Sequence, residues 1–170
     1  ITIELTVDEL FPSIITKDLT DIDGLLAVYT TQFDQYNKNR SQNISLAVKN
    51  INNVLLRPNQ IFSFNQNVGL RLEKYGYKEA PVFIDGKLVL DWGGGVCQVS
   101  STLYNAALLA DMSIEERTSH YRPAPYVPLG QDAAVADNLL DFKFKNTSSH
   151  NIYIISEVSG NQLSVYILGK

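Results

Sequence analysis

The chain's only cysteine stands at a glycine-rich junction that favours a reactive thiol. Residues 91–110 read DWGGGVCQVSSTLYNAALLA, so three glycines and a valine precede Cys97. The residues that follow are good helix formers without Pro or Gly, and they predict a helix with Cys97 in its first turn. Free N–H groups and the positive end of the helix dipole favour the nucleophilic thiolate there. We interpret Cys97 as a nucleophile; the alternative is a small buried side chain, the usual role of a lone cysteine.

A cysteine nucleophile needs a general base, and His120 is the candidate. It lies on the segment that returns past the predicted helix, whereas His150 sits in a turn-like stretch. A third group would orient the imidazole, although an Asp before a strand is more often a turn residue. The candidates are the downstream residues Asp132 and Asp141, with Asp137 and Asn138 behind them.

Further groups suit an oxyanion or an anionic substrate. Backbone N–H groups of the glycine region can stabilise an oxyanion, and arginines bind carboxylates in bidentate fashion. For each side chain an ordinary surface role is the alternative. The candidates for the oxyanion or the substrate are Gly94, Gly95, Gln98, Ser100, Arg71 and Arg117, with Arg122 as a further arginine. The candidates for the walls of a groove are Trp92, Tyr121 and Tyr126.

The elements that must position these residues predict an α+β domain, with a largely antiparallel sheet and two main helices. The central helix has Cys97 at its N-terminus and ends near Asp111. The other helix is capped by Ser41 and is broken by Pro58. The apolar face of this helix comprises Ile44, Ala47, Val48, Ile51 and Leu55.

Alternating and apolar runs predict the strands. A hairpin is expected over residues 80–90, because Asp85-Gly86 separates two apolar runs, and another over residues 152–168 around Gly160. The other expected strands are residues 1–7, 25–33, 61–64, 114–120, 133–136 and 140–145. Residues 65–77 are expected to form a loop or short helix, and residues 121–129, with three prolines, an ordered loop.

Composition narrows the class of protein. The chain has 170 residues, 45% of them hydrophobic, which suits one domain with a proper core. The net charge of −4 and the scattered basic residues argue against a nucleic-acid partner. One cysteine and two histidines do not favour a structural zinc site. No apolar stretch approaches the ~20 residues of a membrane span, so we expect no membrane contact by this segment itself. We also expect the domain to be a monomer.

Six segments, in this order, carry a family resemblance: NRSQNISLAVKNINNVLLRPNQIFSFNQNVG, GYKEAPV, GGGVCQVSSTLYNAALLADM, ERTSHY, YVPLGQDAAV and LDFKFKN. The most specific is GGGVCQVSSTLYNA. Through these segments the chain resembles the VanW family, named from vancomycin-resistance gene clusters, over about residues 39–146. Where the family pattern has Asn-His-Ser, this chain has Ser119-His120-Tyr121, which keeps the histidine.

The resemblance implies a Gram-positive envelope protein that works on the extracellular face, in the cell wall. In this family the whole protein often carries a membrane anchor and peptidoglycan-binding or other repeat domains. On that basis residues 1–23 are an incoming strand and linker after an upstream module, and residues 24–170 are the VanW-like catalytic domain.

The resemblance also implies L,D-transpeptidase activity, which makes 3→3 cross-links between peptidoglycan stem peptides. Cys97 would be the nucleophile and His120 the proton carrier, and no metal or organic cofactor is required. The chain lacks the His-Gly-Cys type of motif of the better-known L,D-transpeptidases. The alternatives are a cysteine peptidase or carboxypeptidase of cell-wall peptides, and a non-catalytic wall-binding module.

Overall fold

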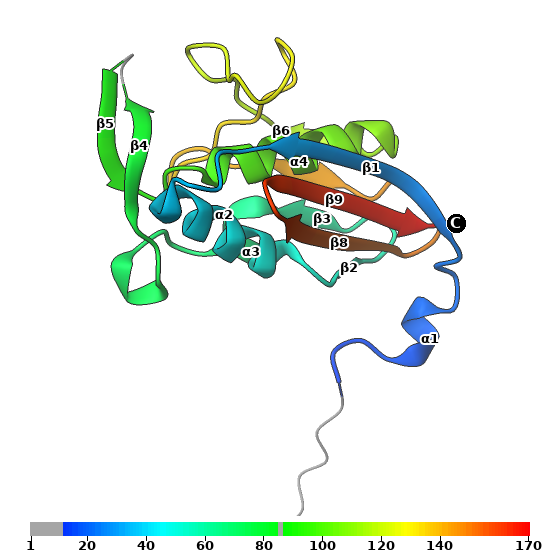
Figure 1. Cartoon of the computed structure of the whole chain (residues 1–170). Helices are drawn as coiled ribbons and strands as arrows, with labels where there is room; N and C mark the ends of the chain where they lie inside the picture. Colours follow the sequence, from blue (N-terminus) through cyan, green and yellow to red (C-terminus); the bar gives the residue numbers. More distant parts are fainter. Residues whose placement is uncertain (1–11, 85–86) are drawn as a thin grey trace, which may run out of the picture.

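The computed structural model describes residues 12–84 and 87–170, and its architecture is α+β, which confirms the predicted class (Figure 1). Its strands form three antiparallel sheets rather than one. The largest sheet joins, in this order, β1 (Gly24–Gln32), β9 (Gln162–Gly169), β8 (Ile152–Ser159) and β2 (Val54–Leu56). The second joins β3 (Ile61–Ser63), β7 (Lys143–Lys145) and β6 (Ser113–Glu116). The third is the hairpin of β4 (Glu79–Ile84) and β5 (Lys87–Trp92).

Two long helices occur in the described chain, as predicted: α2 (Lys38–Ile51) and α4 (Val96–Leu109). The shorter ones are α1 (Thr16–Leu19), α3 (Phe64–Val68) and the 3₁₀ helix η1 (Glu73–Tyr75). No helix in the described ranges is long and apolar enough to cross a membrane.

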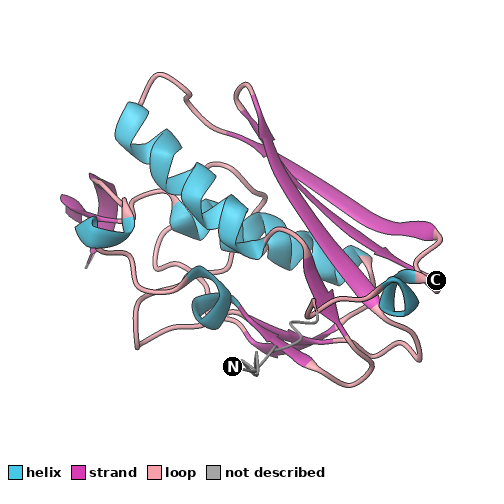
Figure 2. Ribbon diagram, turned by 90° about the horizontal axis from the view of Figure 1, so that it is seen from below, coloured by secondary structure: helices cyan, strands magenta, loops and turns pink. Residues whose placement is uncertain are grey.

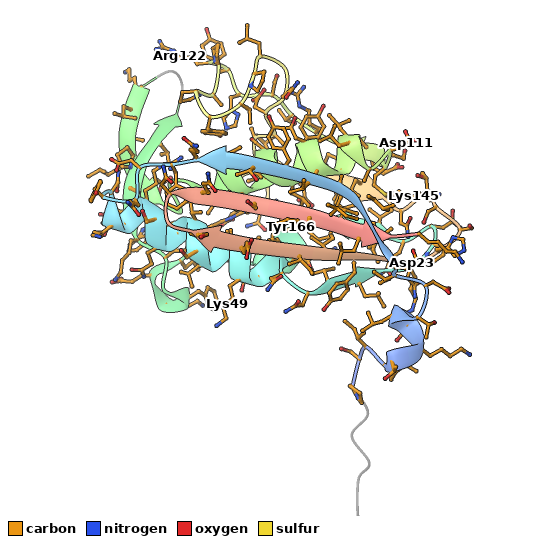
Figure 3. All side chains as sticks on the ribbon, turned by 45° about the vertical axis from the view of Figure 1, so that its right-hand side comes forward. Asp23, Lys49, Asp111, Arg122, Lys145 and Tyr166 are labelled. Carbon is orange, nitrogen blue, oxygen red and sulfur yellow. The ribbon has the colours of Figure 1, made fainter. Side chains whose placement is uncertain are left out.

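The two long helices pack against one face of the four-stranded sheet (Figure 2). α2 contacts β8, while α4 contacts β1 and β9 and also reaches β6 of the second sheet. Alternation along β9 buries Leu163, Val165 and Ile167 against the helices. Tyr166, between them, faces the other side of the sheet, where its hydroxyl donates to Glu157 (Figure 3). One core therefore holds α4, the helix that carries Cys97.

The first long helix differs at both ends from the predicted range. It begins after Asn37, whose side-chain oxygen accepts a hydrogen bond from the backbone N–H of Arg40 at 3.2 Å. Ser41, the predicted cap, lies inside the helix and donates to the Asn37 carbonyl. The predicted continuation to Leu55 is wrong, because Asn53 has a left-handed backbone (φ 61°) and Leu55 belongs to β2.

The strand predicted over residues 133–136 is also wrong. Its only bridges are isolated ones, from Ala134 to Thr118 and from Ala136 to Leu140, and Ala133 and Val135 instead bind side chains of α4. The N–H of Ala133 donates to the hydroxyl oxygen of Ser101 at 2.9 Å, and the hydroxyl of Ser100 donates to the Ala133 carbonyl at 2.7 Å. The segment therefore runs beside the start of a helix instead of joining a sheet.

The remaining strand predictions are confirmed in part. Both hairpins form, and strands overlap the ranges 25–33, 61–64, 114–120 and 140–145, although the last two are shorter than predicted. Part of the predicted linker, residues 8–23, is helical as α1. The strand predicted over residues 1–7 lies outside the described residues, and the boundary at residue 23 stays a prediction.

The three glycines allow the start of α4 to approach its neighbours closely. Gly93 and Gly95 have positive φ angles of 78° and 108°. A Cβ on Gly94 would lie 2.8 Å from the carbonyl oxygen of Ala80 in β4, and one on Gly95 would lie 2.9 Å from Cγ of Arg40 in α2. The glycines thus place the first turn of α4 directly on the hairpin and on α2.

Gly94→Ala should lower the free energy of unfolding by about 1–3 kcal/mol, because its Cβ meets a strand backbone that cannot move aside. Gly24→Ala is the matched control: neither glycine has a positive φ, but a Cβ at Gly24 makes an ordinary 3.6 Å contact. Its effect should stay within about 0.5 kcal/mol. Urea unfolding measures both, and equal stabilities of the two variants would contradict the close-approach argument.

Candidate functional site

Cys97 is the second residue of α4, and its side chain faces the segment 132–135. Its side chain is half-buried. The sulfur accepts from the N–H of Val135 at 3.5 Å and lies 3.4 Å from the carbonyl oxygen of Val135, to which the protonated thiol donates. The Cys97 carbonyl in turn accepts from the hydroxyl of Ser101 at 2.7 Å. The thiol therefore has a defined position at the edge of the core.

His120 and Asp132 form a hydrogen-bonded pair beside this thiol. The Nδ1 atom of His120 lies 2.6 Å from Oδ2 of Asp132, and the backbone N–H of His120 donates to the same oxygen at 2.6 Å. Asp132 is only 7% exposed, and His120 is half-buried. Because Nδ1 is bound to the carboxylate, Nε2 is the ring nitrogen left to interact with the Cys97 thiol, whose pKa His120 lowers.

The charges of the three groups support one another. Burial opposes ionisation of the Cys97 thiol, but the hydrogen bond and positive charge of His120 outweigh it and lower the pKa of Cys97. Burial likewise opposes the imidazolium, yet Cys97 and Asp132 together raise the pKa of His120. The pKa of Asp132 is lowered despite its burial, because it accepts from the backbone and side chain of His120. The site thus favours a thiolate, an imidazolium and a carboxylate in a row.

Arg117 fixes the carboxylate end of this row. Its Nε donates to the Asp132 carbonyl at 2.7 Å, and its Nη2 donates to the Asp132 carboxylate at 3.0 Å and to the Gly130 carbonyl at 3.1 Å. The guanidinium lies over the ring of Tyr104, 5.4 Å from its centroid, and Tyr104 packs edge-on against the buried Phe142. Arg117 was predicted to bind substrate, but in the structure its donors hold Asp132 in position.

Backbone N–H groups at the start of α4 are available to an oxyanion. Those of Val96 and Gln98 donate to the carbonyls of Gly93 and Gly95, each at 3.0 Å. Those of Gly95 and Cys97 have no acceptor within the described chain. N–H groups in the first turn point out of the helix N-terminus, where they can donate to a negatively charged oxygen.

Two of the predicted oxyanion donors have other partners. The amide nitrogen of Gln98 donates to the Thr31 hydroxyl at 3.0 Å and to the Gln32 carbonyl at 2.8 Å. The Ser100 hydroxyl donates to the carbonyls of Ala133 and Cys97. Both side chains are buried, so this geometry does not support the oxyanion role expected for Gln98 and Ser100.

Other predicted residues lie apart from the row or are already paired. Asp141, the alternative acid, accepts from the Ser63 hydroxyl at 2.6 Å and from the Asn65 N–H at 2.9 Å, at the start of α3. Arg71 is buried and pairs with Asp137, although its charge still contributes to the lowered pKa of Cys97. Arg122 is exposed in the loop after His120, at the top of Figure 3.

Sequence reasoning missed one residue of the site, Arg40, because it placed Arg40 outside the first helix. Arg40 lies in the first turn of α2, and its Nη2 donates to the Gln98 side-chain oxygen at 2.6 Å. Tyr126, predicted as a groove wall, is half-buried near Ser101, and burial together with the Cys97 charge raises its pKa. A neutral phenol and a guanidinium thus flank the thiol. Within residues 12–84 and 87–170 no three His, Cys, Asp or Glu side chains lie close enough together to hold a metal ion.

Comparison with known proteins identifies relatives of this chain. Residues 39–168 match the family described as "VanW like protein". The "Uncharacterized protein YoaR" of Bacillus subtilis is 43% identical over 164 residues, or 96% of this chain and 54% of YoaR. The "Vancomycin B-type resistance protein VanW" of Enterococcus faecalis is 31% identical over 134 residues, or 75% of this chain and 49% of that protein. The chain spans about half the length of these curated relatives, and no solved structure matches significantly.

The pH dependence of Cys97 alkylation tests the charge arrangement. Because the folded pKa of Cys97 is lowered, reaction with iodoacetamide should reach half its maximal rate at a lower pH than for a free thiol. His120→Ala removes the stabilising hydrogen bond and charge, so the midpoint should move to higher pH. His150→Ala, on the remote turn, is the control and should leave the midpoint unchanged. An unshifted midpoint in His120→Ala would remove His120 from the site.

The two candidate acids should separate in the same assay. Asp132→Asn weakens the stabilisation of the imidazolium, so it should lower the pKa of His120 and raise the alkylation midpoint of Cys97. Asp141→Asn should leave that midpoint unchanged and lower the free energy of unfolding by about 1–3 kcal/mol, because it disturbs buried hydrogen bonds at α3. Equal effects of both variants on the thiol would contradict the assignment of Asp132.

Proposed function

Because this chain belongs to the VanW family and its site joins a thiol to an imidazole and a carboxylate, we propose that it is a cysteine-dependent L,D-transpeptidase of peptidoglycan. The family and the name of its vancomycin-resistance relative support a role related to the cell wall. The row of Cys97, His120 and Asp132 is the observation that carries the chemistry. Such a row suits acyl transfer from a peptide carbonyl.

In the first half of the reaction, the Cys97 thiolate attacks the carbonyl carbon of the third residue of a tetrapeptide stem. The carbonyl oxygen becomes an oxyanion, and the N–H groups of Gly95 and Cys97 donate to it. His120 gives its proton to the departing amine as the C–N bond breaks. The products are a thioester on Cys97 and free D-alanine.

In the second half, an amine of a neighbouring stem attacks the thioester. His120 accepts the proton of that amine, the C–S bond breaks, and the thiolate is restored. The new amide is a 3→3 cross-link. Asp132 keeps the imidazole oriented and stabilises its positive charge in both halves, as the carboxylate of a catalytic triad does.

Substrate and location belong to this proposal. Peptidoglycan stems lie outside the cytoplasmic membrane, so the domain would act on the extracellular face of the cell envelope. The curated relatives are about twice as long as the aligned chain, which supports a domain that works within a larger protein. The chemistry itself requires neither a metal nor an organic cofactor.

A carboxypeptidase is the second candidate, because it would form the same thioester and differ only in using water as the acceptor. A wall-binding module without catalysis gains nothing from a thiol with a lowered pKa, and this favours an enzyme.

Incubation with disaccharide-tetrapeptide tests the proposal. Mass spectrometry should find loss of D-alanine and formation of a cross-linked dimer. Cys97→Ala should abolish both products, and His120→Ala should lower the rate by roughly 10²–10⁴, the range for loss of a general base. His150→Ala should keep the full rate.

A free tripeptide without dimer would favour the carboxypeptidase. Unchanged substrate, in the presence of a thiol that reacts with iodoacetamide, would overturn both enzymatic functions and favour the wall-binding module.

A further inference from the structure

Neighbouring residues hold Arg40 in a defined position near the candidate nucleophile Cys97. It lies in the first turn of α2, and its aliphatic stem crosses Gly95, the residue that caps α4. A Cβ on Gly95 would come within 2.9 Å of Cγ of Arg40. The third glycine before Cys97 therefore makes room for this stem, and the guanidinium extends over the start of α4.

A chain of hydrogen bonds holds the guanidinium in place. Its Nη2 donates to the side-chain oxygen of Gln98 at 2.6 Å. The amide nitrogen of Gln98 donates to the Thr31 hydroxyl of β1, which is 2.8 Å from the Thr102 hydroxyl of α4. Gln98, Thr31 and Thr102 are all buried, so a polar network inside the core holds the guanidinium of Arg40 in place.

Arg40 is half-buried, yet it has no carboxylate partner within the described chain. Arg57, Arg71 and Arg117 each form an ion pair, with Asp18, Asp137 and Asp132 respectively. Arg40 bonds only to the neutral Gln98, and Asp34, the acid whose charge reaches it, lies beyond ion-pair distance in an exposed loop. A half-buried guanidinium with unused donors suits an external anion.

The nucleophile lies within the electrostatic range of Arg40. Burial lowers the pKa of Arg40, while the charges of Tyr126, Asp34 and Cys97 oppose this effect. An anion bound by Arg40 would therefore lie next to the reacting bond. In a donor stem, the terminal carboxylate is only one residue beyond the scissile carbonyl, a spacing of about 3.8 Å between Cα atoms.

We propose that Arg40 binds the C-terminal carboxylate of the acyl donor and so makes the site select a peptide bond one residue from a free chain end. This inference rests on the proposed function and gives that function its substrate class: stems with a free α-carboxylate on the leaving residue. Stems amidated at this carboxylate are rejected, because the guanidinium then lacks an anionic partner.

Binding is measured first, in the Cys97→Ala background, so that no turnover intervenes. The probes are disaccharide-tetrapeptide and the same molecule with a C-terminal amide, titrated by calorimetry. The acid should bind about 10- to 100-fold more tightly than the amide, the range expected for a charge-assisted bidentate contact. Adding Arg40→Gln should remove this difference, because it removes the positive charge.

Arg57→Gln is the matched control, because it removes the same charge from an exposed residue at the end of β2. It should leave the preference for the acid intact. Circular dichroism and thermal unfolding of each variant check the fold. Arg40→Lys should recover part of the preference, since it restores the charge without the bidentate geometry.

Two results would overturn the inference: equal binding of acid and amide by the chain with Arg40, or a preference that survives Arg40→Gln. Arg40 would then only join α2 to α4. Failure to bind either probe would overturn it as well.

Turnover by the chain with Cys97 separates this inference from the proposed function. If Arg40→Gln slows acid and amide equally, the inference fails and the transpeptidase stands. If the acid preference in binding depends on Arg40 but no D-alanine is released, the transpeptidase fails and the carboxylate site stands.

Discussion

The seam between the first turn of α4 and the segment 132–135 determines the geometry of the whole site. Ser101 and Ser100 bind both backbone groups of Ala133, and Cys97 binds both backbone groups of Val135. These bonds replace the strand pairing that the segment would otherwise need. Because Asp132 precedes Ala133 directly, the seam also delivers the carboxylate that holds His120. The candidate nucleophile, base and orienting acid thus depend on one set of backbone contacts.

The seam is rigid because the core supports it from both sides. α4 packs on β1 and β9, and its buried residues belong to the same hydrophobic cluster as those of the sheet. On the other side, Arg117 connects Asp132 to Tyr104 and the stacked phenylalanines Phe142, Phe144 and Phe62. A site whose acid is anchored to the core loses little by reorganisation when charge develops.

Partial burial sets the charge state of the site. Taken alone, burial would keep the Cys97 thiol and the His120 imidazole neutral. Each becomes charged because the other does, and Asp132 supplies the second negative charge that offsets the imidazolium. Removal of one member therefore changes the ionisation of the other two. This coupling explains why the pKa of a half-buried thiol is lowered.

The sequence by itself determined the α+β class, both C-terminal hairpin strands and the glycine-to-helix junction at Cys97, because each of these follows from local periodicity or turn chemistry. It also indicated His120 as the candidate base. It did not decide between Asp132 and Asp141, since both precede apolar residues, and only the folded chain places one against His120 and the other at α3. Arg40 and Gln98 are far apart in sequence, and α2 and α4 bring them together only when both pack on one sheet. Tertiary structure decided these roles because a hydrogen bond between distant residues depends on how separate elements pack, which local sequence patterns do not encode.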